Sequence, residues 1–465
     1  MDFDKAIEAL KDELITSTQE VIRIKSVEDD PQKGMPFGKG PYDALCYCLD
    51  LGEKLGFKAK NLDGYAGHLD FGEGEEVVGV LGHLDVVPEG DGWTFPPYGA
   101  EIHDNKIYGR GSMDDKGPVM AALYSMKALK DSGVKLNKKI RLILGTNEET
   151  GWGCMHHYFA NETPPSMAFT PDADFPVIHG EKGIIVFDLK YKIDSLEDES
   201  FSLLSLKGGN AANMVPDYAE AVIKVDSIDK SIDALRRYAN EKGYQADIKE
   251  DNGNLKVSVN GKSAHGSTPE KGENAITYLL NLLYSHFNGE SSIYNFLDWY
   301  EKSLAFKYNG ENFGCEFEDE LSGKLNLNVG VIKLVGEEII LSINIRYPIS
   351  YKREDIYSSI RAHLKGLPIE IIEGNSDKDP LYVPKDDVLV QTLMKVYQEQ
   401  TGDYGTEPLV IGGGTYARAM KNAVAFGPVF PGQEELAHQK DEFISIDNLV
   451  KLTQIYTHAL YELAK

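Results

Sequence analysis

Three short apolar runs in the first part of the chain each lead to a residue type that can bind a metal ion. They are 77–81 leading to Gly82-His83, 139–146 leading to Glu148-Glu149, and 167–170 leading to Asp172. A helical pattern over 116–130 separates the first two runs. Strands alternating with a helix, with polar side chains after the strand ends, predict an α/β fold. Its open sheet would place a functional crevice at the carboxyl ends of the strands.

The pattern of apolar and polar residues changes after about residue 180. Segments rich in β-branched and apolar residues then alternate with helical patterns, which is typical of an α+β domain. The β-rich segments are 183–193, 218–226, 255–260 and 338–347, and the helical ones lie near 228–242, 273–288 and 353–365. We therefore expect a catalytic domain in two parts, 1–180 and 383–465, with an inserted α+β domain over 181–382.

The composition limits the kinds of partner. The 465 residues carry 48 Lys and Arg against 74 Asp and Glu, a formal charge of −26. This acidic balance argues against a nucleic-acid partner, because phosphate binding needs a basic surface. No apolar stretch approaches the length of a membrane span, and the start lacks the pattern of a signal peptide. Four scattered cysteines suggest free thiols in a reducing cytoplasm.

The tetrapeptide Gly-His-Leu-Asp occurs twice, at 67–70 and at 82–85. In the second copy, His83 and Asp85 would share one face of a strand, so His83 could bind a metal while Asp85 accepts its other ring N–H. The first copy is followed by charged residues and predicts an exposed hairpin. We therefore expect His83, and not His68, to be a ligand.

Two pairs of adjacent acids complete the candidate chemistry. Asp114-Asp115 follows a glycine-rich turn and precedes a helix, so one carboxylate could bridge two metals while the other is structural or caps the helix. Of Glu148-Glu149, one could be a ligand and the other could act on water. Asp172 and His438 have weak local context alone. Together, two imidazoles and three carboxylates could hold a pair of divalent ions, with a further glutamate as proton shuttle.

Several longer motifs carry a resemblance to a known family. They are Gly-His-Leu-Asp-Val-Val-Pro (82–88), Gly-Trp-Thr (92–94), Gly-Arg-Gly-Ser-Met-Asp-Asp-Lys-Gly-Pro (109–118), Gly-Thr-Asn-Glu-Glu-Thr (145–150) and Gly-Gly-Gly-Thr-Tyr-Ala-Arg (412–418). Over essentially its whole length, the chain resembles the M20 family of co-catalytic zinc metallopeptidases. Within that family it is most similar to the PepV-type bacterial dipeptidases.

The resemblance implies a role for each candidate residue. His83 and Asp172 would hold one metal, Glu149 and His438 the other, and Asp115 would bridge them. Glu148 would be the general base, and Asp85 the partner of His83. The two divalent ions would be Zn²⁺, although Mn²⁺ or Co²⁺ suits the same ligands.

The inserted domain corresponds to the lid of this family. In PepV-type enzymes an enlarged lid stands in for a partner subunit, which implies a monomer. His265, Asn213 and Arg346 match the lid positions that reach over the site and contact the substrate. The backbone of Gly413 and Gly414, with the hydroxyl of Thr415, could hold a substrate carboxylate. The glycine run lacks the Lys of a P-loop, so a phosphate-transfer enzyme is a distant alternative.

These observations predict a metal-dependent dipeptidase that hydrolyses small unblocked dipeptides through a metal-activated water. An N-acyl-amino-acid deacylase or a carboxypeptidase on the same scaffold would have the same metal site and differ in its lid. A non-catalytic metal-binding or peptide-binding protein is the alternative from another class. The intact Glu148 beside a full ligand set argues against it.

Overall fold

The computed structural model describes residues 3–196, 201–374, 377–434 and 436–465. The chain forms two compact units. The first contains Met1–Gly180, Tyr382–Leu409 and Gly414–Lys465, and the second contains Glu181–Leu381 and Val410–Gly413. No sequence pattern indicated that Val410–Gly413 belongs to the second unit.

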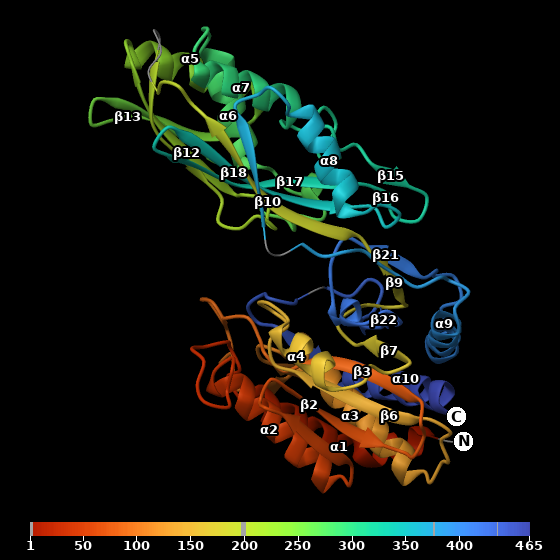
Figure 1. Cartoon of the computed structure of the whole chain (residues 1–465). Helices are drawn as coiled ribbons and strands as arrows, with labels where there is room; N and C mark the ends of the chain where they lie inside the picture. The colour runs from red at the N-terminus through yellow and green to blue at the C-terminus, as the bar shows by residue number, and fades with distance from the viewer. Residues whose placement is uncertain (1–2, 197–200, 375–376, 435) are drawn as a thin grey trace. The chain divides into compact units, whose positions relative to one another are not determined.

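A nine-stranded sheet organises the first unit (Figure 1). Its order is β1 (Lys58–Leu62), β2 (Ala66–Phe71), β6 (Lys139–Gly145), β3 (Val77–His83), β7 (Met167–Thr170), β22 (Ala423–Ala425), β9 (Ile178–Glu181) and β20 (Leu381–Tyr382), with β21 (Leu409–Ile411) also paired to β9. The central strands β6, β3, β7 and β22 are parallel. Their carboxyl ends therefore share one edge, as an open α/β sheet requires.

Helices and small strands surround this sheet. They are α1 (Phe3–Ile22), α2 (Lys39–Lys54), α3 (Lys116–Asp131), α4 (Gly153–Asn161), α9 (Val388–Thr401), α10 (Ile446–Ala464) and the 3-10 turn η2 (Tyr416–Ala419). The strands β4 (Glu101–His103), β5 (Lys106–Tyr108) and β24 (Phe443–Ser445) form one small sheet, and β8 (Ala173–Asp174) pairs with β23 (Pro428–Val429).

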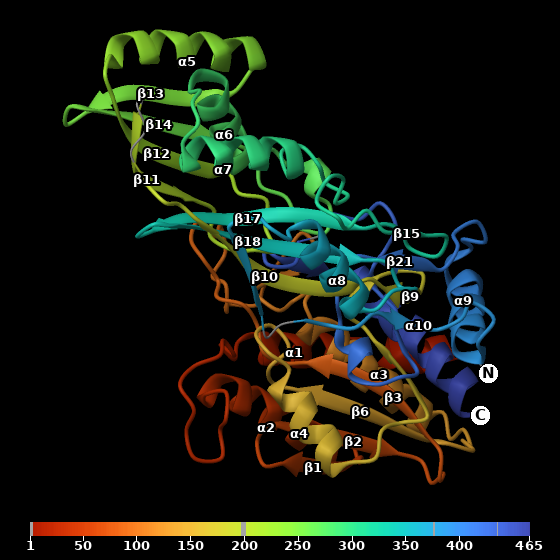
Figure 2. The same cartoon turned by 45° about the horizontal axis from the view of Figure 1, so that its top comes forward.

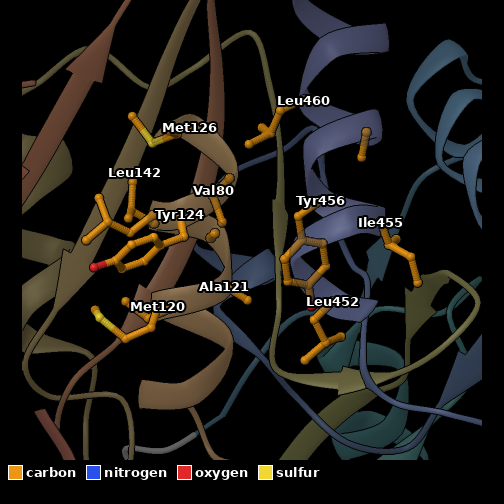
Figure 3. Packing of buried hydrophobic residues seen from close by; sticks show 14 of the residues in the cluster. Val80, Met120, Ala121, Tyr124, Met126, Leu142, Leu452, Ile455, Tyr456 and Leu460 are labelled. Atoms are coloured by element: carbon orange, nitrogen blue, oxygen red, sulfur yellow. The ribbon is translucent and has the colours of Figure 1, made fainter. Parts of the chain in front are cut away.

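The core of the first unit lies between helices α3 and α10 and the strands beneath them. Figure 3 shows Met120, Tyr124 and Tyr456 gathered with Val80 of β3 and with other side chains of the cluster. All of these side chains are fully buried, and burial of each large apolar side chain contributes about 1.5–3 kcal/mol. This packing joins α10, which follows His438 in sequence, to the strand that ends at His83.

The second unit is built on an eight-stranded sheet in which every pair is antiparallel. The order is β13 (Gln245–Asp251), β14 (Asn254–Asn260), β12 (Tyr218–Val225), β11 (Phe201–Gly208), β17 (Asn326–Val335), β18 (Glu338–Tyr347), β10 (Gly183–Lys192) and β19 (Ile369–Glu373). Along β10 buried and partly exposed residues alternate, so one face of the strand packs into the core.

Helices cover the sheet of the second unit. Figure 2 shows α5 (Ile228–Lys242), α6 (Ala275–His286) and α7 (Ser292–Ser303) together on one side of it. The remaining elements are α8 (Arg353–His363), the 3-10 turn η1 (Pro269–Lys271), and the hairpin of β15 (Glu318–Asp319) and β16 (Gly323–Lys324). In the described part of the chain, no helix combines the length and the apolar character needed to cross a membrane.

Candidate active site

Polar side chains from the parallel strands of the first unit meet at one edge of the sheet. His83 ends β3, Glu148 and Glu149 follow β6, and Asp172 follows β7. Asp114 joins them from the turn before α3. Two overlapping groups have potential ligand atoms within 4.8 Å of one another, namely His83 with Asp114 and Glu149, and His83 with Glu148 and Asp172.

The carboxylate of Asp114 lies between two imidazoles. Its Oδ1 is 2.9 Å from His83 Nε2, and its Oδ2 is 3.1 Å from His438 Nε2. On one side Asp172 Oδ2 is 3.8 Å from His83 Nε2, and on the other Glu149 Oε2 is 3.1 Å from His438 Nε2. The cluster thus divides into a His83–Asp172 half and a Glu149–His438 half that share Asp114.

This geometry corrects the sequence-based expectation that Asp115 is the bridging carboxylate. Asp115 Oδ2 instead accepts a hydrogen bond of 3.1 Å from the backbone N–H of His83. Within the described residues its Oδ1 has no hydrogen-bond partner. The side chain of Asp115 therefore faces the backbone of β3, and Asp114 occupies the position between the histidines.

Asp85 fixes the neighbours of the cluster through both its backbone and its side chain. Its carbonyl oxygen accepts a hydrogen bond of 3.0 Å from His83 Nδ1, while its carboxylate lies 3.6 Å from that nitrogen. Asp85 is therefore the partner of His83, as expected, but the closer acceptor is its backbone carbonyl and not its carboxylate. With the proton on Nδ1, Nε2 presents its lone pair to the cluster. The carboxylate of Asp85 accepts hydrogen bonds of 3.0 Å from the backbone N–H groups of Glu148 and Glu149.

Trp152 orients Glu148, a contact that the sequence did not reveal. The indole Nε1 of Trp152 donates a hydrogen bond of 3.0 Å to Glu148 Oε1. Trp152 has a φ of 63°, in the left-handed region that residues other than glycine rarely adopt. Its ring packs edge-on against Tyr416, whose hydroxyl contacts Cys154 Sγ at 2.9 Å.

Burial and crowding of acidic groups perturb the protonation of the cluster. Burial raises the pKa of Glu148 to about 8. Burial also raises the pKa of Asp172, and the charge of Asp114 raises it further. Hydrogen bonds to Asp114 and Glu149 raise the pKa of His438 to about 11. Burial lowers the pKa of His83, but nearby carboxylates, chiefly Asp114, outweigh this and raise it well above its usual value.

The residues of the cluster are of the kinds that bind divalent metal ions. Four carboxylates, those of Asp114, Glu148, Glu149 and Asp172, gather around His83. Such a concentration of negative charge needs compensating cations. His83 Nε2 is buried and lacks a hydrogen bond to any described residue, although Asp114 Oδ1 is only 2.9 Å away. Imidazole and carboxylate together are ligands that suit Zn²⁺, Mn²⁺ or Co²⁺.

A cavity of about 520 Å³ adjoins this cluster within the first unit. Asp85 and Glu149 form part of its wall, so a molecule in the cavity would lie next to the candidate ligands. The volume matches that of sites for small organic ligands. The remaining lining residues come from 27–31, 86–88 and Thr150.

Within the second unit, Asn213 and His265 lie on neighbouring exposed loops. The backbone N–H of Gly266 donates a hydrogen bond of 2.7 Å to the carbonyl of Asn213. The ring Nδ1 of His265 is 2.6 Å from Ser267 Oγ. The second unit therefore brings these two expected lid residues together.

Arg346 is a buried residue of β18 in the same unit. Its Nε donates to Asn344 Oδ1 at 2.9 Å, and its Nη1 donates to the carbonyl of Gly412 at 2.8 Å. Arg346 thus holds the segment Val410–Gly413, which includes Gly413. Gly414 and Thr415 belong to the first unit. There the hydroxyl of Thr415 accepts a hydrogen bond of 3.2 Å from the backbone N–H of Ala417 and caps η2.

His68, in the other Gly-His-Leu-Asp copy, lies apart from the candidate ligand groups of the described residues. The expectation of an exposed hairpin is wrong, because β2 pairs on both sides and His68 is buried. Its Nδ1 shares a hydrogen bond of 2.9 Å with the hydroxyl of Tyr158. Asp70 pairs with Arg141, whose Nε donates to Asp70 Oδ1 at 2.7 Å. This copy is part of the folded core.

Comparisons with known proteins agree with these motifs. The model of "Peptidase family M20/M25/M40" matches residues 79–462. A Bacillus subtilis protein named "Putative dipeptidase YtjP" is 43% identical over 477 residues, with all of both chains covered. A Staphylococcus epidermidis protein named "Putative dipeptidase" is 39% identical, with 97% of both chains covered.

Two solved structures share the fold. The dipeptidase Dug1p of Saccharomyces cerevisiae has a TM-score of 0.58 at 14% identity, with 99% of this chain and 98% of that chain covered. The aminoacylhistidine dipeptidase of Vibrio alginolyticus has a TM-score of 0.59 at 16% identity, with 97% and 96% covered. The match of the family model over most of the chain, together with the full-length relatives, shows that this protein belongs to peptidase family M20/M25/M40 and is a hydrolase acting on peptide bonds.

Proposed function

We propose that this protein is a dipeptidase that hydrolyses unblocked dipeptides with two divalent metal ions. The observation that carries the proposal is the carboxylate of Asp114 between His83 and His438, with Glu148 in the same cluster. Full-length relatives at 43% and 39% identity are also named as dipeptidases. We also propose that the protein is located in the cytoplasm and acts as a monomer.

Five side chains would hold the ions. His83 and Asp172 would bind one, Glu149 and His438 the other, and Asp114 would bridge them. When bound, divalent ions lower the pKa of water and polarise a carbonyl group, and the donor set of imidazoles and carboxylates suits Zn²⁺. The carboxylate of Asp85, through the backbone of residues 148 and 149, would keep the acids in place.

Glu148 would move the proton during hydrolysis. Its carboxylate would accept a proton from the attacking water, whose oxygen forms a bond to the peptide carbonyl carbon. As the carbon–nitrogen bond breaks, Glu148 would return that proton to the leaving amine. The hydrogen bond from Trp152 occupies Glu148 Oε1, so Oε2 would be the atom that accepts the proton.

The second unit would supply substrate recognition. His265 would stabilise the oxyanion, and Asn213 would contact the substrate beside it. Arg346 would act together with the backbone of Gly413 and Gly414 and the hydroxyl of Thr415 on the free carboxylate of the dipeptide. Within the second unit, the hydrogen bond from Arg346 to the carbonyl of Gly412 keeps Arg346 beside the segment that contains Gly413. A clamp on the free carboxylate would favour short substrates.

A panel of substrates tests this function. Chelator-treated protein is assayed on unblocked dipeptides, matched tripeptides and N-acetyl amino acids, before and after addition of Zn²⁺ or Mn²⁺. Metal-dependent cleavage confined to dipeptides is the expected result. Cleavage of N-acetyl amino acids instead would make the protein a deacylase with the same metal site. No cleavage in any assay would favour a binding protein.

A further inference from the structure

The carboxylate of Glu442 accepts four hydrogen bonds in the interior of the first unit. Its Oε2 accepts from Arg110 Nη1 at 2.8 Å and from the backbone N–H of Gly111 at 3.0 Å. Its Oε1 accepts from the backbone N–H groups of Met113 at 2.8 Å and Asp114 at 3.1 Å. Glu442 is completely buried, and such a carboxylate is tolerated only when hydrogen bonds replace its lost hydration.

These bonds fix the turn that carries the shared carboxylate of the cluster. Gly111 has a φ of 85°, in the left-handed region, so the turn follows a path that requires glycine there. Glu442 binds three of the four backbone N–H groups from Gly111 to Asp114. The backbone of Asp114 is therefore held at the residue whose side chain lies between the two histidines.

The same residue also anchors the segment that carries His438. The backbone N–H of Gly109 donates to the carbonyl of Glu442 at 2.9 Å, and Arg110 Nη1 donates to the carbonyl of Gln439 at 3.2 Å. The side chain of His438 is 52% exposed, so packing alone does not hold it. Its place depends on the attachment of residues 439–442 to the turn at 109–114.

We infer that Glu442 is a positioning residue that sets the separation between Asp114 and His438. It joins two segments that lie far apart in the sequence, and each segment contributes one ligand. This inference rests on the proposed two-metal site. Loss of the Glu442 carboxylate would therefore loosen Asp114, which both ions would share, and would weaken most the ion that Glu149 and His438 hold, because Glu442 also anchors the segment of His438.

Glu442→Gln is the sharpest test. The amide keeps the size of the side chain but turns an NH₂ group toward N–H donors. Chelator-treated protein is titrated with Co²⁺ alone, by calorimetry and by visible absorption, and its unfolding in urea is measured separately. We expect wild-type protein to bind in two steps. In Glu442→Gln, the step that is also lost in His438→Ala should weaken about 10- to 100-fold.

Asp70→Asn is the matched control, because Asp70 is also a carboxylate bound to an arginine in the first unit, away from the cluster. It should lower the resistance to urea and leave both Co²⁺ steps unchanged. Wild-type Co²⁺ affinities in Glu442→Gln, or an equal loss in Asp70→Asn, would overturn the inference. Failure of the wild-type protein to bind Co²⁺ would overturn the proposed function as well.

Arg110→Lys serves if Glu442→Gln does not fold. It keeps a positive charge and leaves Glu442 its three backbone donors, so the change is milder. The expected result is a smaller loss of affinity confined to the same Co²⁺ step. Two Co²⁺ steps with wild-type affinities in folded Arg110→Lys would contradict the inference.

Discussion

The buried imidazole of His68 should make the protein sensitive to acid. Burial, with a smaller contribution from the charge of Arg141, lowers the pKa of His68 from 6.5 to about 4. The native state therefore resists protonation, while the unfolded chain takes up a proton below about pH 6.5. The stabilisation is present above pH 6.5 and is lost as the pH falls toward 4.

The size of this effect follows from the two pKa values. The difference between pKa values of 6.5 and about 4 corresponds to a loss of about 3 kcal/mol of unfolding free energy when the pH has fallen below both values. Between pH 8 and pH 5, the loss of unfolding free energy assigned to His68 is about 2 kcal/mol. The side chain is only 5% exposed, so solvent does not screen this effect strongly.

His68→Asn removes the titrating group and keeps a polar atom near the hydroxyl of Tyr158. Urea unfolding of wild-type and variant proteins, both in chelator, is measured at pH 8 and pH 5. From pH 8 to pH 5 the wild-type protein should lose about 2 kcal/mol more than the variant. An equal loss in both proteins would show that His68 does not cause the acid sensitivity. The metal content of His68→Asn should match that of the wild type, and that of His83→Asn should fall.

Three further substitutions test separate parts of the structure. Glu148→Gln should keep both metals, measured by elemental analysis, and lower kcat about 10²- to 10⁴-fold, because the general base is lost; retained turnover would exclude that role. Trp152→Phe should lower kcat about tenfold with little change in metal content, because Glu148 loses its orienting hydrogen bond; a change in KM alone would contradict this. Tyr456→Phe removes the buried hydrogen bond of 3.0 Å to the carbonyl of Phe426 and should lower the unfolding free energy by about 1 kcal/mol in urea. An unchanged urea midpoint for Tyr456→Phe would show that this bond adds no stability.

The sequence was most informative where a local pattern determines the structure. Apolar runs identified β3, β6 and β7, and the candidate ligands stand at the ends of these strands because parallel strands share an edge. Clusters of β-branched residues likewise marked β10, β12, β14 and β18 in the second unit.

The remaining features depend on contacts between distant residues. Adjacent side chains such as Asp114 and Asp115 are chemically alike, and only the path of the turn decides which one faces the histidines. His68 seemed exposed because the pairing of β2 with β6 is not visible in the local sequence. Glu442 gave no signal of its own, since its partners lie more than 300 residues earlier in the chain.

The dependence of activity on metal equivalents tests the two-metal dipeptidase most directly. Chelator-treated protein receives measured amounts of Zn²⁺ or Mn²⁺, and dipeptide hydrolysis and bound metal are followed in the same samples. We expect activity to reach its maximum at two bound ions per chain, and we expect that Asp114→Asn never reaches it, while Asp115→Asn retains two ions. Full activity at one ion per chain, or full activity without metal, would contradict a two-metal dipeptidase.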